Sequence, residues 1–123
     1  MTPELCIPEE PLNVPWESCL TLGVDFTYEY GDHYKSPREL VGMLVNIVAK
    51  GGNMALNVSP QPDGRIPVDA WDSLNGFGQW MKTFGDAIYG TASARRTRAE
   101  PFRSHRKEIP SMCSDCIRRY RNR

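Results

Sequence analysis

Long apolar runs are missing from this sequence. Nothing in its 123 residues approaches the 18 consecutive apolar residues typical of a membrane-spanning helix. The first residues, Met1 to Glu4, also lack the charged and then apolar pattern of a secretory signal. We therefore predict no membrane partner. The compartment of the parent protein stays open between cytoplasm, lysosome and extracellular space.

Cysteine is also scarce, with four residues whose spacing matches no disulfide framework. We interpret Cys6, Cys19, Cys113 and Cys116 as thiols. Cys113 and Cys116 form one CxxC without a second pair, and His105 stands at no ligand spacing, so we expect no zinc site. No phosphate-binding GxxxxGK pattern follows the glycine pair at 51–52. The sequence therefore predicts neither a metal nor a cofactor.

The formal net charge of zero conceals two compositions. Twelve of the 15 acidic residues lie within 1–94, whereas ten of the 15 basic residues lie within 95–123. No hydrophobic period survives after residue 91, so we expect 92–123 to be a disordered basic tail. Such a tail can contact nucleic acid electrostatically. The simpler interpretation is that the basic tail is solvated and has no partner. We therefore expect no nucleic acid as a binding partner.

The stretch 50–64 predicts the local architecture most clearly. Gly51 and Gly52 can adopt the positive φ that ends a helix. Residues 54–58 form an apolar run bounded by breakers, typical of a strand covered on both faces. A helix that leads into a strand through a tight turn is half of a parallel βα repeat.

Further elements agree with this pattern. Ser36-Pro37-Arg38-Glu39 has the form of a capping box, and the broad apolar face that follows predicts a sheet-packed helix from 37 to about 50. Residues 16–22 form a short candidate strand. A second helix should begin at Pro67 and reach about Phe84, with Trp71, Leu74, Phe77 and Met81 on one face.

Five segments stand in a fixed order within residues 2–91. They are 15–23 (PWESCLTLG), 34–40 (YKSPREL), 50–60 (KGGNMALNVSP), 62–67 (PDGRIP) and 85–91 (GDAIYGT). In this order and spacing they resemble the α-L-fucosidases of glycoside hydrolase family 29. The resemblance implies a retaining glycosidase that releases terminal α-L-fucose from fucosylated oligosaccharides or glycoconjugates.

The resemblance also implies the fold. Residues 1–91 would be a C-terminal fragment of a catalytic (β/α)₈ TIM-like barrel, covering its last two or three βα units, because a whole barrel needs about 250 residues. The aspartate nucleophile and the sugar-binding histidines of the family would lie upstream, outside this chain. By the same resemblance, the β-sandwich that usually follows the barrel would also lie outside this chain, and an out-of-frame end would explain the basic tail.

Two glutamates are candidates for the acid/base of a retaining glycosidase, which pairs this group with the nucleophile. Glu4 stands on the loop that matches the family's acid/base region. Glu17 belongs to the better matched tryptophan–glutamate motif, and its apolar neighbours Trp16 and Cys19 are of the kind that raise a carboxyl pKa. A residue before Met1 is the third alternative.

Two aromatic residues are candidates for substrate binding. Trp16 precedes Glu17. Phe26 occupies the position where many relatives have a tryptophan, and an aromatic there would stack on fucose. The alternative for Phe26 is an aromatic that packs in the core or the loop. The triplet Asn57-Val58-Ser59 fits the glycosylation pattern, but a buried strand followed by Pro60 makes it a poor acceptor.

The alternative hypothesis is a non-catalytic fragment or interaction module from a broken gene. In either case we expect no activity from this chain alone, and its oligomeric state stays open.

Overall fold

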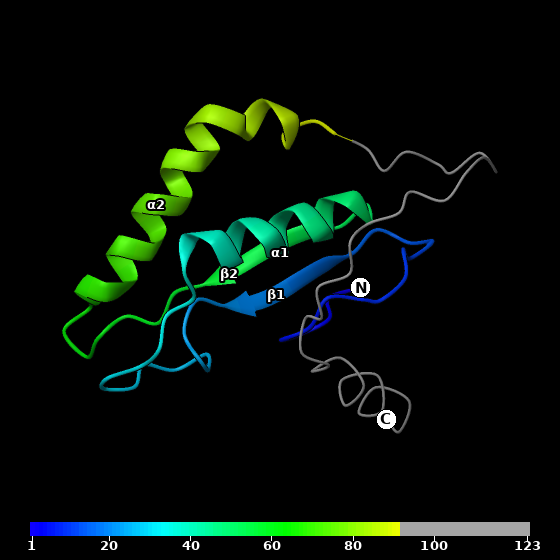
Figure 1. Ribbon diagram of the computed structural model, residues 1–123. Helices are drawn as coiled ribbons and strands as arrows, with labels where there is room; N and C mark the ends of the chain where they lie inside the picture. Colours follow the sequence, from blue (N-terminus) through cyan, green and yellow to red (C-terminus); the bar gives the residue numbers. More distant parts are fainter. Residues whose placement is uncertain (92–123) are drawn as a thin grey trace, which may run out of the picture.

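The computed structural model describes residues 1–91, which form two parallel strands and two main helices (Figure 1). In chain order the elements are β1 (Glu17–Thr21), α1 (Pro37–Ala49), β2 (Asn53–Asn57), α2 (Val68–Phe84) and the short 3₁₀ helix η1 (Gly85–Ala87). The described residues therefore have the predicted α/β character. The tail predicted at 92–123 lies outside them.

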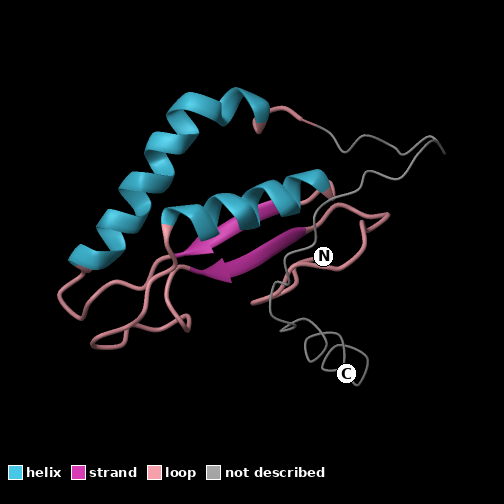
Figure 2. Ribbon diagram, in the orientation of Figure 1, coloured by secondary structure: helices cyan, strands magenta, loops and turns pink. Residues whose placement is uncertain are grey.

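The two strands pair in parallel from Glu17 opposite Asn53 to Thr21 opposite Asn57. Figure 2 shows both arrows pointing the same way, with α1 lying along them. The N-terminal residues extend this sheet, because Glu4 forms an isolated parallel bridge with Cys19. The Leu5 amide donates to the Cys19 carbonyl at 2.8 Å, and the Cys19 amide donates to the Pro3 carbonyl at 2.9 Å. The order across the sheet is thus the N-terminal segment, β1 and β2.

One face of the sheet carries the apolar core. Leu20 and Trp16 pack with Ile47 of α1, while Leu22 packs with Leu40 of α1 and Ala70 of α2. Alternation along the strands sends residues two apart to the same face. The opposite face therefore presents Glu17, Cys19, Thr21, Asn53, Ala55 and Asn57.

No described helix covers this second face, which we call the open face. Of its residues, only Thr21 is buried within the described part of the chain. The prediction that residues 54–58 are covered on both faces is therefore wrong for the described residues, since all five residues of β2 are exposed or half-buried. The strand also begins and ends one residue earlier than predicted.

The helix α1 begins as its sequence predicts. The Glu39 amide donates to Ser36 Oγ at 3.3 Å, and the Ser36 amide donates to the Glu39 carboxylate at 2.8 Å, which completes the capping box. At the other end Gly51 has φ +78°, a conformation that favours glycine. Gly52 has no positive φ, and its role is steric. A Cβ there would collide with the Trp16 indole.

The helix α2 differs in detail from its prediction. Pro67 is the N-cap residue rather than the first helical residue, and Gly85 ends the helix with a right-handed φ of −58°. Leu74 and Phe77 pack against the core, but Trp71 is 50% exposed. Trp71 therefore does not share the buried face as predicted.

Candidate active site at the carboxyl edge

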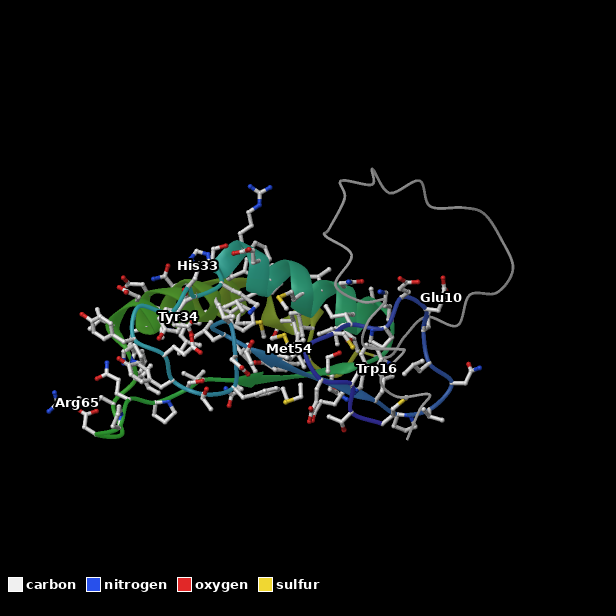
Figure 3. All side chains as sticks on the ribbon, turned by 90° about the horizontal axis from the view of Figure 1, so that it is seen from below. Glu10, Trp16, His33, Tyr34, Met54 and Arg65 are labelled. Carbon is white, nitrogen blue, oxygen red and sulfur yellow. The ribbon has the colours of Figure 1, made fainter. Side chains whose placement is uncertain are left out.

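Both strands of the parallel sheet end at the same edge, which we call the carboxyl edge. The loop 22–36 leaves this edge after β1, and the loop 58–67 leaves it after β2. Figure 3 shows His33, Tyr34 and Arg65 at this end of the strands, with Trp16 at the other end. In parallel α/β folds ligands bind beside the carboxyl ends of the strands. The carboxyl edge is therefore the candidate active site.

Lys35 closes the base of the loop 22–36. Its backbone amide donates to the Leu22 carbonyl at 2.9 Å, and its ammonium Nζ donates to the Gly23 carbonyl at 2.7 Å. The same ammonium lies 3.5 Å from Thr21 Oγ1, which itself donates to the Gly23 carbonyl at 2.8 Å. Burial lowers the pKa of Lys35, while the nearby carboxylates of Asp32 and Glu39 oppose that shift. Lys35 thus fixes the two ends of the loop together.

Asp32 organises the loop from within. Its Oδ1 accepts hydrogen bonds from the Val24 amide at 3.1 Å and from the His33 amide at 2.7 Å. A Cβ on Gly23 would collide with this carboxylate. The neighbouring Tyr34 has a raised pKa, first because of partial burial and then because of the Asp32 charge. The loop therefore has a defined conformation rather than a free one.

Phe26 lies on this loop, and its backbone is tied to the end of β2. The Phe26 carbonyl accepts from Asn57 Nδ2 at 3.1 Å and from Ser59 Oγ at 2.8 Å. The half-buried Phe26 is thus held at the carboxyl edge. Asn57 and Ser59 were identified from the sequence only as a glycosylation pattern. Their place at the end of a predicted strand could have identified them as residues of the carboxyl edge.

Glu17 lies at the opposite end of the sheet. It is the first residue of β1, four steps of about 3.3 Å and so about 13 Å along the strand from Thr21. Its side chain is exposed in the described structure, so the predicted apolar surroundings are not present. In parallel barrels the amino end of a strand serves stability rather than catalysis. The position of Glu17 therefore does not favour a catalytic role.

Trp16 also departs from its predicted role. It is only 3% exposed and packs with Leu20 and Ile47 in the core, at the amino end of β1. Its indole Nε1 is buried without a hydrogen-bond partner among the described residues. A buried core position does not suit contact with a substrate, so Trp16 is a packing residue in this structure.

Glu4 lies on the N-terminal segment, beside the middle of β1. Because it pairs with Cys19, its side chain lies on the open face together with those of Cys19 and Thr21. The next residue, Leu5, has φ +55°, which is rare for a residue other than glycine, and here the N-terminal segment stops following β1. Glu4 thus stands where the N-terminal segment stops following β1, opposite the middle residue of that strand.

The described residues contain no group of three His, Cys, Asp or Glu side chains able to hold a metal ion. None of the helices in this part of the chain is long and apolar enough to cross a membrane. Cys6 and Cys19 are not joined in a disulfide in the described part of the chain. Cys113, Cys116 and His105 lie outside the described residues.

The arrangement defines a class of protein, namely an α/β protein with parallel βα units and a polar site at the carboxyl ends of its strands. Comparison with known proteins identifies the family within this class. The family model of the alpha-L-fucosidases matches residues 1–86. The chain belongs to the alpha-L-fucosidase family.

Individual relatives agree with this assignment. The plasma alpha-L-fucosidase of Rattus norvegicus is 41% identical over 85 residues, which are 65% of this chain and 18% of the relative. The alpha-L-fucosidase of Dictyostelium discoideum is 37% identical over 83 residues, with the same two shares. The chain therefore spans less than a fifth of the length of these two relatives.

Solved structures share both the sequence and the fold. Alpha-L-fucosidase isoenzyme 1 from Paenibacillus thiaminolyticus superposes with a TM-score of 0.74 at 39% identity, over 80% of this chain and 25% of that chain. The alpha-fucosidase of Thermotoga maritima in complex with fucose gives a TM-score of 0.67 at 42% identity, over 72% and 21% of the two chains.

Proposed function

We propose that the protein to which this chain contributes is a retaining α-L-fucosidase, which releases terminal α-L-fucose from fucosylated glycans. Family membership supports the reaction class. The complex of the Thermotoga maritima relative with fucose supports the sugar. Within this chain, the observation that supports the proposal is the position of Glu4. It lies on the open face, at the end of an extended segment beside β1.

The open face is central to the proposed architecture. A closed barrel fills its interior with side chains from all its strands. The residues on the open face are small or polar, including Cys19, Ala55 and Asn57, and they would line that interior once further strands close the barrel. The N-terminal segment, β1 and β2 would then be three neighbouring strands. In this proposal the described residues belong to the last two or three βα units of the barrel.

Glu4 acts in this proposal as the acid/base. An aspartate from outside residues 1–123 attacks the anomeric carbon, and the bond to the leaving oxygen breaks as the Glu4 carboxyl donates its proton to that oxygen. Water then attacks the anomeric carbon of the covalent intermediate while Glu4 takes a proton from that water, and the ester bond to the aspartate breaks. No cofactor or metal is needed. Phe26 contributes an aromatic surface for the sugar.

A chimera tests this proposal. Residues 1–91 replace the matching segment of the Paenibacillus thiaminolyticus isoenzyme, which is 39% identical to this chain. We expect the chimera to hydrolyse phenyl α-L-fucoside, whose poor leaving group requires a proton. Glu4→Gln should lower kcat/KM for this substrate by about 10²- to 10⁴-fold, the usual contribution of general acid–base catalysis. With 2,4-dinitrophenyl α-L-fucoside, whose leaving group departs without a proton, added azide should restore turnover of the Glu4→Gln chimera and give fucosyl azide, because the anion attacks the covalent intermediate without a base.

Glu17→Gln is the matched control, since it makes the same chemical change about 13 Å along β1 from the carboxyl edge. We expect its kcat/KM to remain within about threefold of the unmodified chimera. The opposite ranking, with azide rescue of Glu17→Gln, would assign the acid/base to Glu17. A folded chimera without turnover would refute the enzymatic proposal and support a non-catalytic module.

A further inference from the structure

Two side chains converge on one backbone oxygen at the carboxyl edge. Asn57 Nδ2 and Ser59 Oγ lie 3.1 and 2.8 Å from the Phe26 carbonyl oxygen, and they lie 3.2 Å from each other. The contacts connect residues that are 31 and 33 positions apart in sequence. They therefore join the loop after β1 directly to the end of β2.

The geometry of this contact suits a fixed anchor. A carbonyl oxygen has two lone pairs, and here both are used by donors from the same strand end. Ser59 is only 8% exposed, so water competes poorly for its hydroxyl. Asn57 is held in place by the backbone hydrogen bonds of the sheet, because its carbonyl accepts a hydrogen bond from the Leu22 amide at 2.9 Å. The donors are thus rigid, and the loop is the partner that they fix.

The same contact accounts for the sequence pattern Asn57-Val58-Ser59. The Asn57 amide nitrogen, which glycosylation would modify, is engaged with the Phe26 carbonyl and with Ser59. The asparagine and the serine are the two ends of the triplet because residues two apart share a face of an extended chain. The pattern therefore has a structural explanation that does not involve a glycan.

We infer that Asn57 and Ser59 are positioning residues, which hold the Phe26 backbone so that its aromatic ring is presented to the bound sugar. This inference rests on the proposed function, because it requires a sugar site at the carboxyl edge. Neither side chain takes part in bond breaking. Their effect should therefore appear in substrate binding and pass through Phe26.

The first test uses the full 123-residue chain and measures amide hydrogen exchange by mass spectrometry. Ser59→Ala removes one donor, so amides of the loop 22–36 should exchange at least about threefold faster while those of α1 do not change. Ser73→Ala is the control, because Ser73 is also 8% exposed but lies on α2. It should leave exchange in the loop unchanged. Equal exchange in the Ser59 variant and the unmodified chain would overturn the inference.

The second test measures kinetics in the active chimera. Ser59→Ala should raise KM by about 2- to 12-fold, the range expected for one hydrogen bond, with kcat changed less than about twofold. Ser59→Thr retains the hydroxyl and should restore most of the lost affinity. Ser73→Ala should not alter KM. An unchanged KM in Ser59→Ala would refute the inference, whereas an inactive unmodified chimera would instead refute the proposed function.

A double-mutant cycle separates positioning from a general loss of stability. If Ser59 acts through the ring of Phe26, Ser59→Ala should change kcat/KM by less than about 1.5-fold in a chimera that already carries Phe26→Ala. A general structural role would give the same loss in both backgrounds. Persistence of the full Ser59→Ala effect in the Phe26→Ala chimera would therefore contradict the inference.

Discussion

The packing of Gly52 against Trp16 gives the sharpest stability prediction. A Cβ at position 52 would lie 2.5 Å from Cη2 of the indole and closer still to Cζ2 and Cε2. Ordinary contacts of this kind begin at 3.4 Å, so the ring or the backbone must move by about 1 Å. The indole cannot simply retreat, because Trp16 is 3% exposed and packs with Leu20 and Ile47.

We therefore expect Gly52→Ala to lower the free energy of unfolding of the full chain by about 1–3 kcal/mol, the usual penalty for overpacking. The measurement is urea denaturation followed by circular dichroism at 222 nm. For a domain of this size each kcal/mol corresponds to a fall in Tm of about 4–8 °C. The backbone at Gly52 has no positive φ, so the penalty should be steric alone.

Gly78→Ala is the matched control. Gly78 lies inside α2, and outside its own stretch of helix no atom lies within 4 Å of the place that an alanine Cβ would take. Alanine should therefore stabilise the helix by about 0.5–1 kcal/mol. Opposite signs for the two glycine substitutions are the central expectation. The cost of Gly52→Ala should also fall below about 0.5 kcal/mol in a Trp16→Phe background, which removes part of the obstructing ring. An equal cost in both backgrounds would refute the steric explanation.

Three further predictions concern the full chain. Ser36→Ala removes the N-cap hydroxyl and should cost about 1 kcal/mol in urea denaturation, whereas Ser36→Thr should retain most of that stability. The Ser36 hydrogen bonds lower the pKa of Glu39 from 4.5, so its stabilising effect is complete above pH 4.5 and is lost as pH falls through the lower, folded-state pKa. Glu39→Gln should flatten the stability curve in that acidic range, and unchanged curvature would contradict this. Without a nucleophile from outside residues 1–123, the chain alone should release no phenol from phenyl α-L-fucoside, and Glu4-dependent release would show a complete site.

The local elements followed from the sequence because their causes are local. The capping box at Ser36 and Glu39 set the start of α1, and the predicted helix end at about 50 differs by one residue from Ala49. The breakers around β2 placed that strand within one residue. In each case neighbouring residues carry the whole signal, so no knowledge of distant contacts was needed.

The candidate site was harder to predict because it depends on faces and distant pairs. Glu17 was assigned an apolar environment from its sequence neighbour Trp16, yet adjacent strand residues point to opposite faces. Trp16 faces the core, and Glu17 faces away from it. The contacts of Phe26 with Asn57 and Ser59 join residues more than 30 positions apart, and no periodic pattern encodes such a pairing.

The parallel register of β1 and β2 has a consequence for the order of folding. Glu17 meets Asn53 only after the chain has travelled out through the loop 22–36 and back through α1. Thirteen helical residues span about 20 Å, close to the roughly 17 Å length of a five-residue strand, whereas the same residues extended would reach about 43 Å. In its helical form α1 thus returns the chain over about the length of one strand. We therefore expect the two strands to pair as the capped helix forms rather than before it, because a flexible connection adds to the loop-closure cost of the pairing.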